Sequence, residues 1–340
     1  MSESDPPDSH FEDVAKAILQ REVIPFLGAG ASLCDRGRAP WKPLQSQFLP
    51  SSNELTDFLA REYNYPSEES KELTRVAQYA VVKKGLAPLY NTLQDIFDKD
   101  YKPTTLHRFL ARLPSRLREN GQKRPGHPVR ERLILVTTNY DDLLERAFDD
   151  EHEPYHKLVY MANEVGMGES LVPQGSFIHW TPDGETSLIE KANEYTGIED
   201  YERSQPPELR HPVIVKIHGA VDRIPSSDPM DPSPVNPSYV ITEDHYIDYL
   251  TARAEISSFL PRSVVATLKK SHYLFLGYSL RDWNLRVMLR RIWREQKLGY
   301  KSWAVQKRVG PLDKEYWLDK GVNIMDIDLR KYTGKLATYL

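Results

Sequence analysis

Residues 133–145 read LILVTTNYDDLLE, an apolar run that passes through small polar residues directly into a helix-like pattern. A short apolar run bounded in this way is typical of a strand buried in a parallel sheet. The pattern recurs in VIPFLGAGAS at 23–32, PVIVKIHG at 212–219 and YLFLGYSLRD at 273–282. Helix-like stretches separate these runs. Strands that alternate with helices predict an α/β protein built on a doubly wound parallel sheet.

Each of the four predicted strands is followed by small or polar residues. These residues are 28–32, 137–141, 218–219 and 277–282. Parallel strands present their carboxyl ends at one edge of the sheet, where open α/β sheets bind their ligands. We therefore predict a single site at this edge, assembled from the ends of four strands that are distant in the sequence.

The segment GAGAS at 28–32 suits a phosphate group. Glycines allow an anion to approach the backbone, and a helix that begins there would supply free N–H groups. The dinucleotide fingerprint G-x-G-x-x-G is incomplete, because Leu33 stands at its last position. An ordinary tight turn between a strand and a helix is the alternative interpretation.

Asn139 and His218 are the candidate catalytic residues. An amide can hold a hydroxyl group or a water molecule, and an imidazole accepts a proton near neutral pH. Each residue also has a structural interpretation, since Asn139 precedes a helix that it could cap and His218 could be a buried structural histidine. Their predicted position at one edge, beside a candidate phosphate turn, favours the catalytic interpretation.

The composition limits the classes of protein that are possible. The chain has 340 residues, of which 40% are hydrophobic, enough for one large domain or two. A formal net charge of -4 gives no global attraction to nucleic acid or membranes. Cys34 is the single cysteine, which excludes an intramolecular disulfide and a cysteine zinc ribbon. The histidines show no metal-binding spacing, so we predict no metal ligands.

The amino-terminal sequence MSESDPPDSHFED lacks the basic start and apolar run of a secretory signal. No run of about 18 apolar residues is long enough to cross a bilayer. We therefore expect a cytoplasmic protein without membrane association. Between 149 and 210 we predict strands in YHKLVYM and SFIHW, within a segment that otherwise reads as loop.

Six segments, taken together and in this order, resemble the SIR2-like (sirtuin-related) family. They are PFLGAGAS, LHRFLARLP, LILVTTNYDDLLE, VIVKIHG, SYVITEDHYIDYL and YLFLGYSLRDWNLRVML. The resemblance is strongest to the bacterial anti-phage branch, whose members degrade NAD. It implies a tail and helix over 1–20 and a Rossmann-like NAD-binding domain over 21–340. A smaller, mainly helical module would be inserted in that domain at 44–130.

The resemblance also implies roles for residues at matching positions. Asn139 and His218 would be catalytic, and the NAD pyrophosphate would lie on Gly28, Ala29, Gly30 and Ser32. The second nucleotide-contacting loop would contain Gly277, Ser279 and Asp282. Ser32 and Thr138 are further candidate phosphate donors, although each could instead cap a helix. Asp141 would orient a neighbour or the ribose, or serve only as an acid in the first turn of a helix.

The activity implied is hydrolysis of NAD to nicotinamide and ADP-ribose by a defence effector that depletes NAD during phage infection. Cleavage of this bond passes through an oxocarbenium-like transition state. One alternative is an NAD-dependent deacylase without zinc, although deacylating sirtuins carry four zinc-binding cysteines. Another is a non-catalytic subunit that binds NAD or ADP-ribose, which would need neither Asn139 nor His218. We expect NAD as the substrate and no zinc.

The resemblance further implies a homo-oligomer and a separate activator, such as a HerA-like ATPase or an argonaute-type protein. Direct binding of nucleic acid is left open by two basic features. Arg286, Arg290 and Arg294 share one side of a predicted helix at 282–297, which is either a solvated face or a docking surface. Basic residues from Arg112 to Arg132 lack interleaved aromatics, which argues against a groove that stacks single strands.

Overall fold

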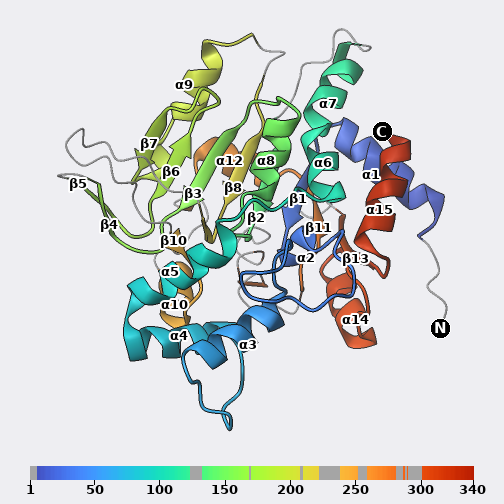
Figure 1. Cartoon of the computed structure of the whole chain (residues 1–340). Helices are drawn as coiled ribbons and strands as arrows, with labels where there is room; N and C mark the ends of the chain where they lie inside the picture. The colour runs from blue at the N-terminus through green and yellow to red at the C-terminus, as the bar shows by residue number, and fades with distance from the viewer. Residues whose placement is uncertain are drawn as a thin grey trace.

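A computed structural model describes residues 6–122, 132–167, 170–206, 210–221, 238–251, 259–280, 286, 287, 289 and 301–340 (Figure 1). The strands are β1 Val23–Leu27, β2 Ile134–Thr137, β3 His156–Tyr160, β4 Val165–Met167, β5 Ser170–Val172, β6 Phe177–Trp180, β7 Thr186–Ile189, β8 Val213–Lys216, β9 Gly219–Ala220, β10 Ser238–Tyr239, β11 His272–Leu276, β12 Ser302–Val305 and β13 Val322–Met325. The helices before β8 are α1 Asp8–Leu19, α2 Ala29–Ser32, α3 Ser52–Glu62, α4 Leu73–Lys84, α5 Leu86–Phe97, α6 Thr105–Ala111, α7 Leu113–Gln122, α8 Leu143–Asp150, η1 Ala192–Glu194 and α9 Gly197–Arg203. The helices after β8 are α10 Glu243–Thr251, α12 Arg262–Leu268, α14 Pro311–Asp319, α15 Leu329–Leu336 and η3 Ala337–Tyr339.

The central sheet runs in the order β13-β12-β11-β1-β2-β8-β3-β6-β7. Every neighbouring pair from β13 to β3 is parallel, and the two strands at the far edge, β6 and β7, are antiparallel. The predicted α/β fold with a doubly wound parallel sheet is therefore confirmed. The strands YHKLVYM and SFIHW are confirmed as well, since they contain β3 and β6.

Both faces of the sheet are covered by helices, which explains why the strands read as unbroken apolar runs. Along β1, Ile24 and Phe26 pack with residues of α12 and α14 on one face. Val23 and Leu27 point the other way and pack with α1, α6, α8 and α15. In the described part of the chain no helix combines the length and apolarity needed to cross a membrane.

The order of the strands reverses between β1 and β11. From β1 the chain proceeds to β2, β3 and β8 on one side, and it returns to β11, β12 and β13 on the other side. In open α/β sheets the loops that follow the strands diverge at such a reversal and leave a crevice for a ligand. The segment after β1 is GAGAS, which contains the short helix α2, and the loop after β11 begins with GYS. Both belong to the four segments that the sequence singles out.

Helices α3, α4 and α5 share a hydrophobic cluster with Tyr239 and Ile241 beside β10, and Figure 1 shows these helices together below the sheet. Helices α6 and α7 instead contribute to the cluster on the α1 face of the main sheet. The predicted helical module at 44–130 thus contains helices with two different packing partners. Its extent as a domain stays a prediction.

Arg286 is the described member of the predicted arginine face. Its guanidinium lies 4.7 Å from the ring centroid of Tyr316, and its Nε donates to the carbonyl of Leu280 at 3.1 Å. Arg286 therefore packs against α14. Arg290 and Arg294 lie outside the described residues, as does most of the predicted helix at 282–297.

Candidate active site

The carboxyl ends of four parallel strands form one row. Leu27 of β1 pairs with Leu276 of β11 and with Thr137 of β2, and Thr137 pairs with Lys216 of β8. The segments that follow these residues therefore leave the sheet at the same edge. The sequence prediction that the four strand ends converge at one edge is confirmed.

Glycines let the loops after β1 and β11 contact each other through their backbones. The N–H of Gly30 donates to the carbonyl of Gly277 at 2.8 Å. A Cβ atom on Gly28 would lie 2.6 Å from Tyr278 Cδ2, and one on Gly30 would lie 2.7 Å from Gly277 O. The structure thus gives these glycines a packing role that the phosphate-turn interpretation did not include. Binding of a phosphate by this loop stays a prediction.

Asn139 connects the loop after β2 to the loop after β1. Its Nδ2 donates to the carbonyl of Gly28 and to Ser32 Oγ, both at 3.1 Å. The Gly28 carbonyl can only accept, which fixes the orientation of the amide. No described residue donates to Asn139 Oδ1, and the residue is 9% exposed. Asn139 does not cap α8, whose N-cap is Asp142.

Ser32 and Asp141 extend this network. Ser32 Oγ donates to Asp141 Oδ2 at 2.9 Å, and the backbone N–H of Leu143 donates to Asp141 Oδ1 at 3.3 Å. Asp141 thus contacts Ser32 and precedes α8, whose first-turn acid is Glu145. Its role toward a ligand stays a prediction. Burial raises the pKa of the Asp141 carboxyl, although the charge of Lys216 and the bond from Ser32 act against this rise.

Lys216 is a residue of the site that the sequence analysis missed. It is fully buried, and its Nζ donates to the backbone carbonyl of Asp141 at 2.5 Å and lies 2.7 Å from Glu145 Oε1. The signal was present in the sequence, because a lysine inside the apolar strand VIVKI needs a buried partner. Lys216 and Glu145 hold the turn that contains Asn139 and Asp141 against β8.

His218 lies two residues beyond Lys216, the last residue of β8. Asn139 lies two residues beyond Thr137, the last residue of β2, and Thr137 pairs with Lys216 because β2 and β8 are neighbours. The imidazole is buried between two tyrosines of α10. The ring centroids of Tyr246 and Tyr249 lie 5.4 and 5.5 Å from that of His218, both edge-on. Asn139 and His218 therefore follow adjacent strands at one edge of the sheet, as predicted. Their catalytic roles stay predictions.

The other predicted residues of the site differ in exposure. Ala29 and Ser279 are exposed on the two glycine-containing loops, and Thr138 is half-buried, with its N–H bound to the carbonyl of Leu27 at 3.2 Å. Gly277 has φ +66°, in the left-handed region that favours glycine. Asp282 lies outside the described residues.

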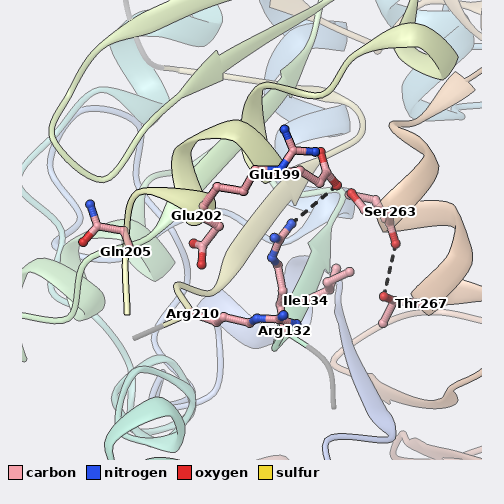
Figure 2. A pocket seen from close by; sticks show the side chains of 10 residues that line it. Arg132, Ile134, Glu199, Glu202, Gln205, Arg210, Ser263 and Thr267 are labelled. Carbon is pink, nitrogen blue, oxygen red and sulfur yellow. Dashed lines mark hydrogen bonds and ion pairs between the residues drawn. The ribbon is translucent and has the colours of Figure 1, made fainter. Parts of the chain in front are cut away.

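A cavity of about 490 Å³ lies at the opposite edge of the sheet (Figure 2). Its lining includes Arg132 and Ile134 at the start of β2, Glu202 on α9 and Ser263 on α12. Arg132 and Ile134 place this cavity at the amino ends of the strands, whereas ligands of doubly wound sheets bind at the carboxyl ends. We therefore place the candidate active site at the carboxyl edge of the sheet and not in this cavity.

Comparisons with known proteins agree with the α/β fold. The family described as "SIR2-like domain" matches residues 133–325, more than half of the chain. A relative named "NAD(+) hydrolase ThsA", from Acinetobacter baumannii (strain 532279), is 25% identical over 280 residues. That match covers 82% of this chain and 41% of the relative, so the chain spans about two fifths of the relative's length.

Proposed function

The chain belongs to the SIR2-like domain family, and we propose that it hydrolyses NAD to nicotinamide and ADP-ribose at the carboxyl edge of its sheet. The observation that carries the proposal is the bonding of Asn139. Both of its amide hydrogens are used within the protein, so its Oδ1 is the atom left to accept a hydrogen bond from a ligand. The name of the relative, an NAD(+) hydrolase, supports the same activity.

In the proposed reaction, water adds to C1′ of the nicotinamide-bearing ribose and the bond from C1′ to nicotinamide breaks. The electron pair of that bond leaves with nicotinamide, which becomes neutral. The transition state is oxocarbenium-like, so the protein has to position the sugar and deliver water. Asn139 Oδ1 would accept from a ribose hydroxyl. His218 would take the proton that the attacking water loses.

The two glycine-containing loops would hold the remainder of the nucleotide. Gly28, Ala29, Gly30 and Ser32 would lie against the pyrophosphate, with Thr138 as a further donor, and Gly277, Ser279 and Asp282 would contribute from the loop after β11. The N–H of Gly30 is bound to Gly277, so we expect phosphate contacts from other donors, such as the exposed Ser279 hydroxyl.

Release of nicotinamide by the purified full chain tests the activity. We expect nicotinamide and ADP-ribose to form from NAD without any acetylated peptide. Loss of a general base typically costs about 100-fold or more, so His218→Asn should slow the reaction by at least that factor. Asn139→Ala removes the proposed acceptor for the ribose hydroxyl and should slow the reaction as well. His152→Asn and Asn91→Ala are matched controls at exposed positions and should keep the parent rate.

The same assay also tests the two alternative functions, a deacylase and a non-catalytic subunit. Nicotinamide release that depends strictly on an acetylated peptide would indicate a deacylase that lacks zinc. Binding of NAD without release, under every condition that supports binding, would indicate a non-catalytic assembly subunit. Equal rates for the parent, His218→Asn and Asn139→Ala would contradict the assignment of the site.

We further propose that the activity serves defence against phage by depleting cytoplasmic NAD, and that the chain works as a homo-oligomer switched on by a separate activator. A HerA-like ATPase or an argonaute-type protein would fit the family. Cells that express the parent chain with its activator should lose NAD after phage infection, and cells that express Asn139→Ala should keep it. A monomer at high concentration in size-exclusion chromatography would contradict the oligomer.

A further inference from the structure

Two histidines and a glutamate meet at the amino edge of the sheet, away from the candidate active site. His156 is the first residue of β3, Glu202 belongs to α9, and His211 precedes β8. Their candidate ligand atoms all lie within 4.8 Å of one another. His156 is fully buried, and the side chains of Glu202 and His211 are 6% and 12% exposed. The sequence could not suggest this group, since 46 and 9 residues separate its members.

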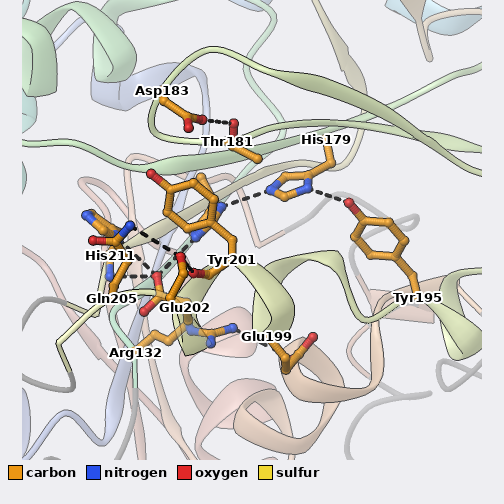
Figure 3. Close-up of polar contacts among 12 residues, drawn as sticks. Arg132, His179, Thr181, Asp183, Tyr195, Glu199, Tyr201, Glu202, Gln205 and His211 are labelled. Atoms are coloured by element: carbon orange, nitrogen blue, oxygen red, sulfur yellow. Dashed lines mark hydrogen bonds and ion pairs between the residues drawn. The ribbon is translucent and has the colours of Figure 1, made fainter.

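Glu202 Oε1 is spaced from each of the two imidazoles much as two ligand atoms of one metal ion are, and the candidate ligand atoms of all three residues lie within 4.8 Å of one another. Figure 3 shows Glu202 beside His211, and Glu202 Oε1 lies 3.0 Å from His211 Nδ1. The same oxygen lies 3.1 Å from His156 Nε2. Ligand atoms of tetrahedral zinc lie about 2.0–2.1 Å from the metal and hence about 3.3 Å from each other. An ion could therefore enter with small side-chain movements. Hydrogen bonds give the same spacing, so the choice depends on the surrounding groups.

The two carboxylate oxygens of Glu202 differ in their hydrogen bonding. Oε1 contacts both imidazoles and also accepts from the backbone N–H of His211 at 3.1 Å. Oε2 is buried and has no hydrogen-bond partner among the described residues. A buried carboxylate oxygen without a partner is costly, and a bound cation would remove that cost. A cation between the three side chains would be within reach of both oxygens.

The second ring nitrogen of His156 is also hydrogen-bonded, as is usual for histidines that bind a metal. Its Nδ1 lies 2.9 Å from His179 Nε2, and His179 Nδ1 lies 2.6 Å from the Tyr195 hydroxyl. Two proton arrangements satisfy this chain. In one, His156 carries its proton on Nε2 and donates to Glu202. In the other, it carries the proton on Nδ1, and the Nε2 lone pair that faces Glu202 is available to a metal.

We propose that His156, Glu202 and His211 bind one divalent transition-metal ion, with Zn²⁺ as the preferred occupant. Two imidazole nitrogens and a carboxylate form a ligand set that zinc accepts, with a fourth position left for water. Glu202 also lines the cavity at this edge, which can supply that water. The ion would join α9 to the first residues of β3 and to the segment before β8.

The proposed site is separate from the chemistry at the carboxyl edge. His211 and His218 lie on either side of β8, seven residues apart, which along an extended strand is about 23 Å. The ion would therefore hold the amino edge together without touching NAD. Binding of the metal and hydrolysis of NAD can be tested independently, so failure of one proposal leaves the other standing.

Calorimetric titration of the full-length chain with Zn²⁺ tests the proposal directly. The protein should carry no affinity tag that binds metals, and it should be treated with a chelator that is then removed. We expect one Zn²⁺ per chain and a higher melting temperature in its presence. Ring ¹⁵N shifts should show the His156 proton on Nδ1, and Nε2 without a proton, once Zn²⁺ is bound. Neither readout depends on enzymatic activity.

Variants locate the ion. Tyr195→Phe removes a supporting partner and should lower the affinity for Zn²⁺ by ~10–100-fold. Glu202→Gln and His211→Ala each remove a ligand and should lower that affinity by more. Two control variants, Glu199→Gln one turn earlier on α9 and His152→Asn, should leave the affinity for Zn²⁺ unchanged. Absence of Zn²⁺ binding by the parent chain would overturn the proposal, as would equal binding by the parent and Glu202→Gln. The titration of the parent decides the matter even if a variant fails to fold.

Discussion

Lys216 lies fully buried beneath the turn that carries Asn139 and Asp141. Its ammonium group contacts the Asp141 carbonyl and the Glu145 carboxylate, whose side chain is 4% exposed. Charges at this depth are stable only when they are paired, because each loses its hydration. The position of the candidate catalytic amide thus depends on an ion pair one layer below it.

Replacement of Lys216 by methionine should therefore destabilise the protein strongly. The substitution keeps the length of the side chain but leaves the Glu145 carboxylate buried without its cation, which typically costs about 3–5 kcal/mol. Urea denaturation measures the loss. Lys301→Met, at an exposed position, should change the free energy of unfolding by less than about 0.5 kcal/mol.

A double variant separates the ion pair from simple packing. Replacing both members, as in Lys216→Met with Glu145→Leu, removes the unpaired charge and should recover most of the stability lost by Lys216→Met. If the double variant is less stable than Lys216→Met, the destabilisation has another origin.

At the scale of elements, the site depends on close contact between the loops after β1 and β11. A Cβ atom on Gly277 would lie 2.3 Å from the backbone nitrogen of Ala31, and the residue has φ +66°. Both the clash and the left-handed backbone oppose any side chain. The two loops can be brought together only by residues without a Cβ atom.

Gly277→Ala should accordingly destabilise the chain by at least about 2 kcal/mol and disturb NAD binding. Gly334→Ala is a matched control, because Gly334 lies within α15 and a Cβ atom there meets nothing within 4 Å. Alanine favours helices, so the control should be neutral or more stable by up to about 1 kcal/mol. Thermal unfolding of both variants measures the difference, and equal melting temperatures would refute the packing role of Gly277.

The sequence predicted the strands that are buried on both faces of the sheet and missed elements such as α9 that are stabilised by tertiary contacts. The runs VIPFL, LILVT and VIVK predicted their strands because a short, continuous apolar run is typical of a strand covered on both faces. Helix α9 lies in a segment whose sequence reads as loop, because its seven residues GIEDYER place only Ile198 in the core. A helix with so short an apolar pattern cannot be recognised without its tertiary partners.

The site was predictable to a similar degree. Glycine-containing and polar strand ends predicted the edge, because all parallel strands end on the same side. The support from Lys216 and Glu145 and the group of His156, Glu202 and His211 were missed, because their members come together only in the folded chain. Asp282 was predicted for the site and lies outside the described residues.

For the molecule as a whole, buried histidines predict loss of stability in mild acid. Burial lowers the pKa of His107 to about 3 and the pKa values of His10 and His245 to about 4, from 6.5 in the unfolded chain. Between these values the unfolded chain binds more protons than the folded one. The stability contributed by the neutral imidazoles is complete above about pH 6.5 and is lost as the pH falls, by about 1.4 kcal/mol per pH unit for each.

His107→Gln isolates this effect. Glutamine can still bond to the backbone N–H of Thr104, as His107 Nδ1 does at 3.2 Å, but it does not titrate. Free energies of unfolding at pH 7.5, 6 and 5 should fall less steeply for the variant, by about 1 kcal/mol per pH unit below pH 6. Burial raises the pKa of Asp141, so Asp141 makes the folded state more stable as the pH falls, opposite to the histidines. This contribution is the same in the parent and the variant and cancels when their pH profiles are compared. Identical pH profiles would contradict the role of His107.

The whole sheet offers two edges to ligands: a carboxyl edge with Asn139 and His218, and an amino edge with the cavity beside Arg132 and Glu202. A crystal structure of the slow variant His218→Asn with NAD chooses between them. The account requires the nicotinamide-bearing ribose at the carboxyl edge, with a hydroxyl group within hydrogen-bond distance of Asn139 Oδ1. NAD bound in the cavity at the amino edge, or a ribose out of reach of Asn139, would contradict it.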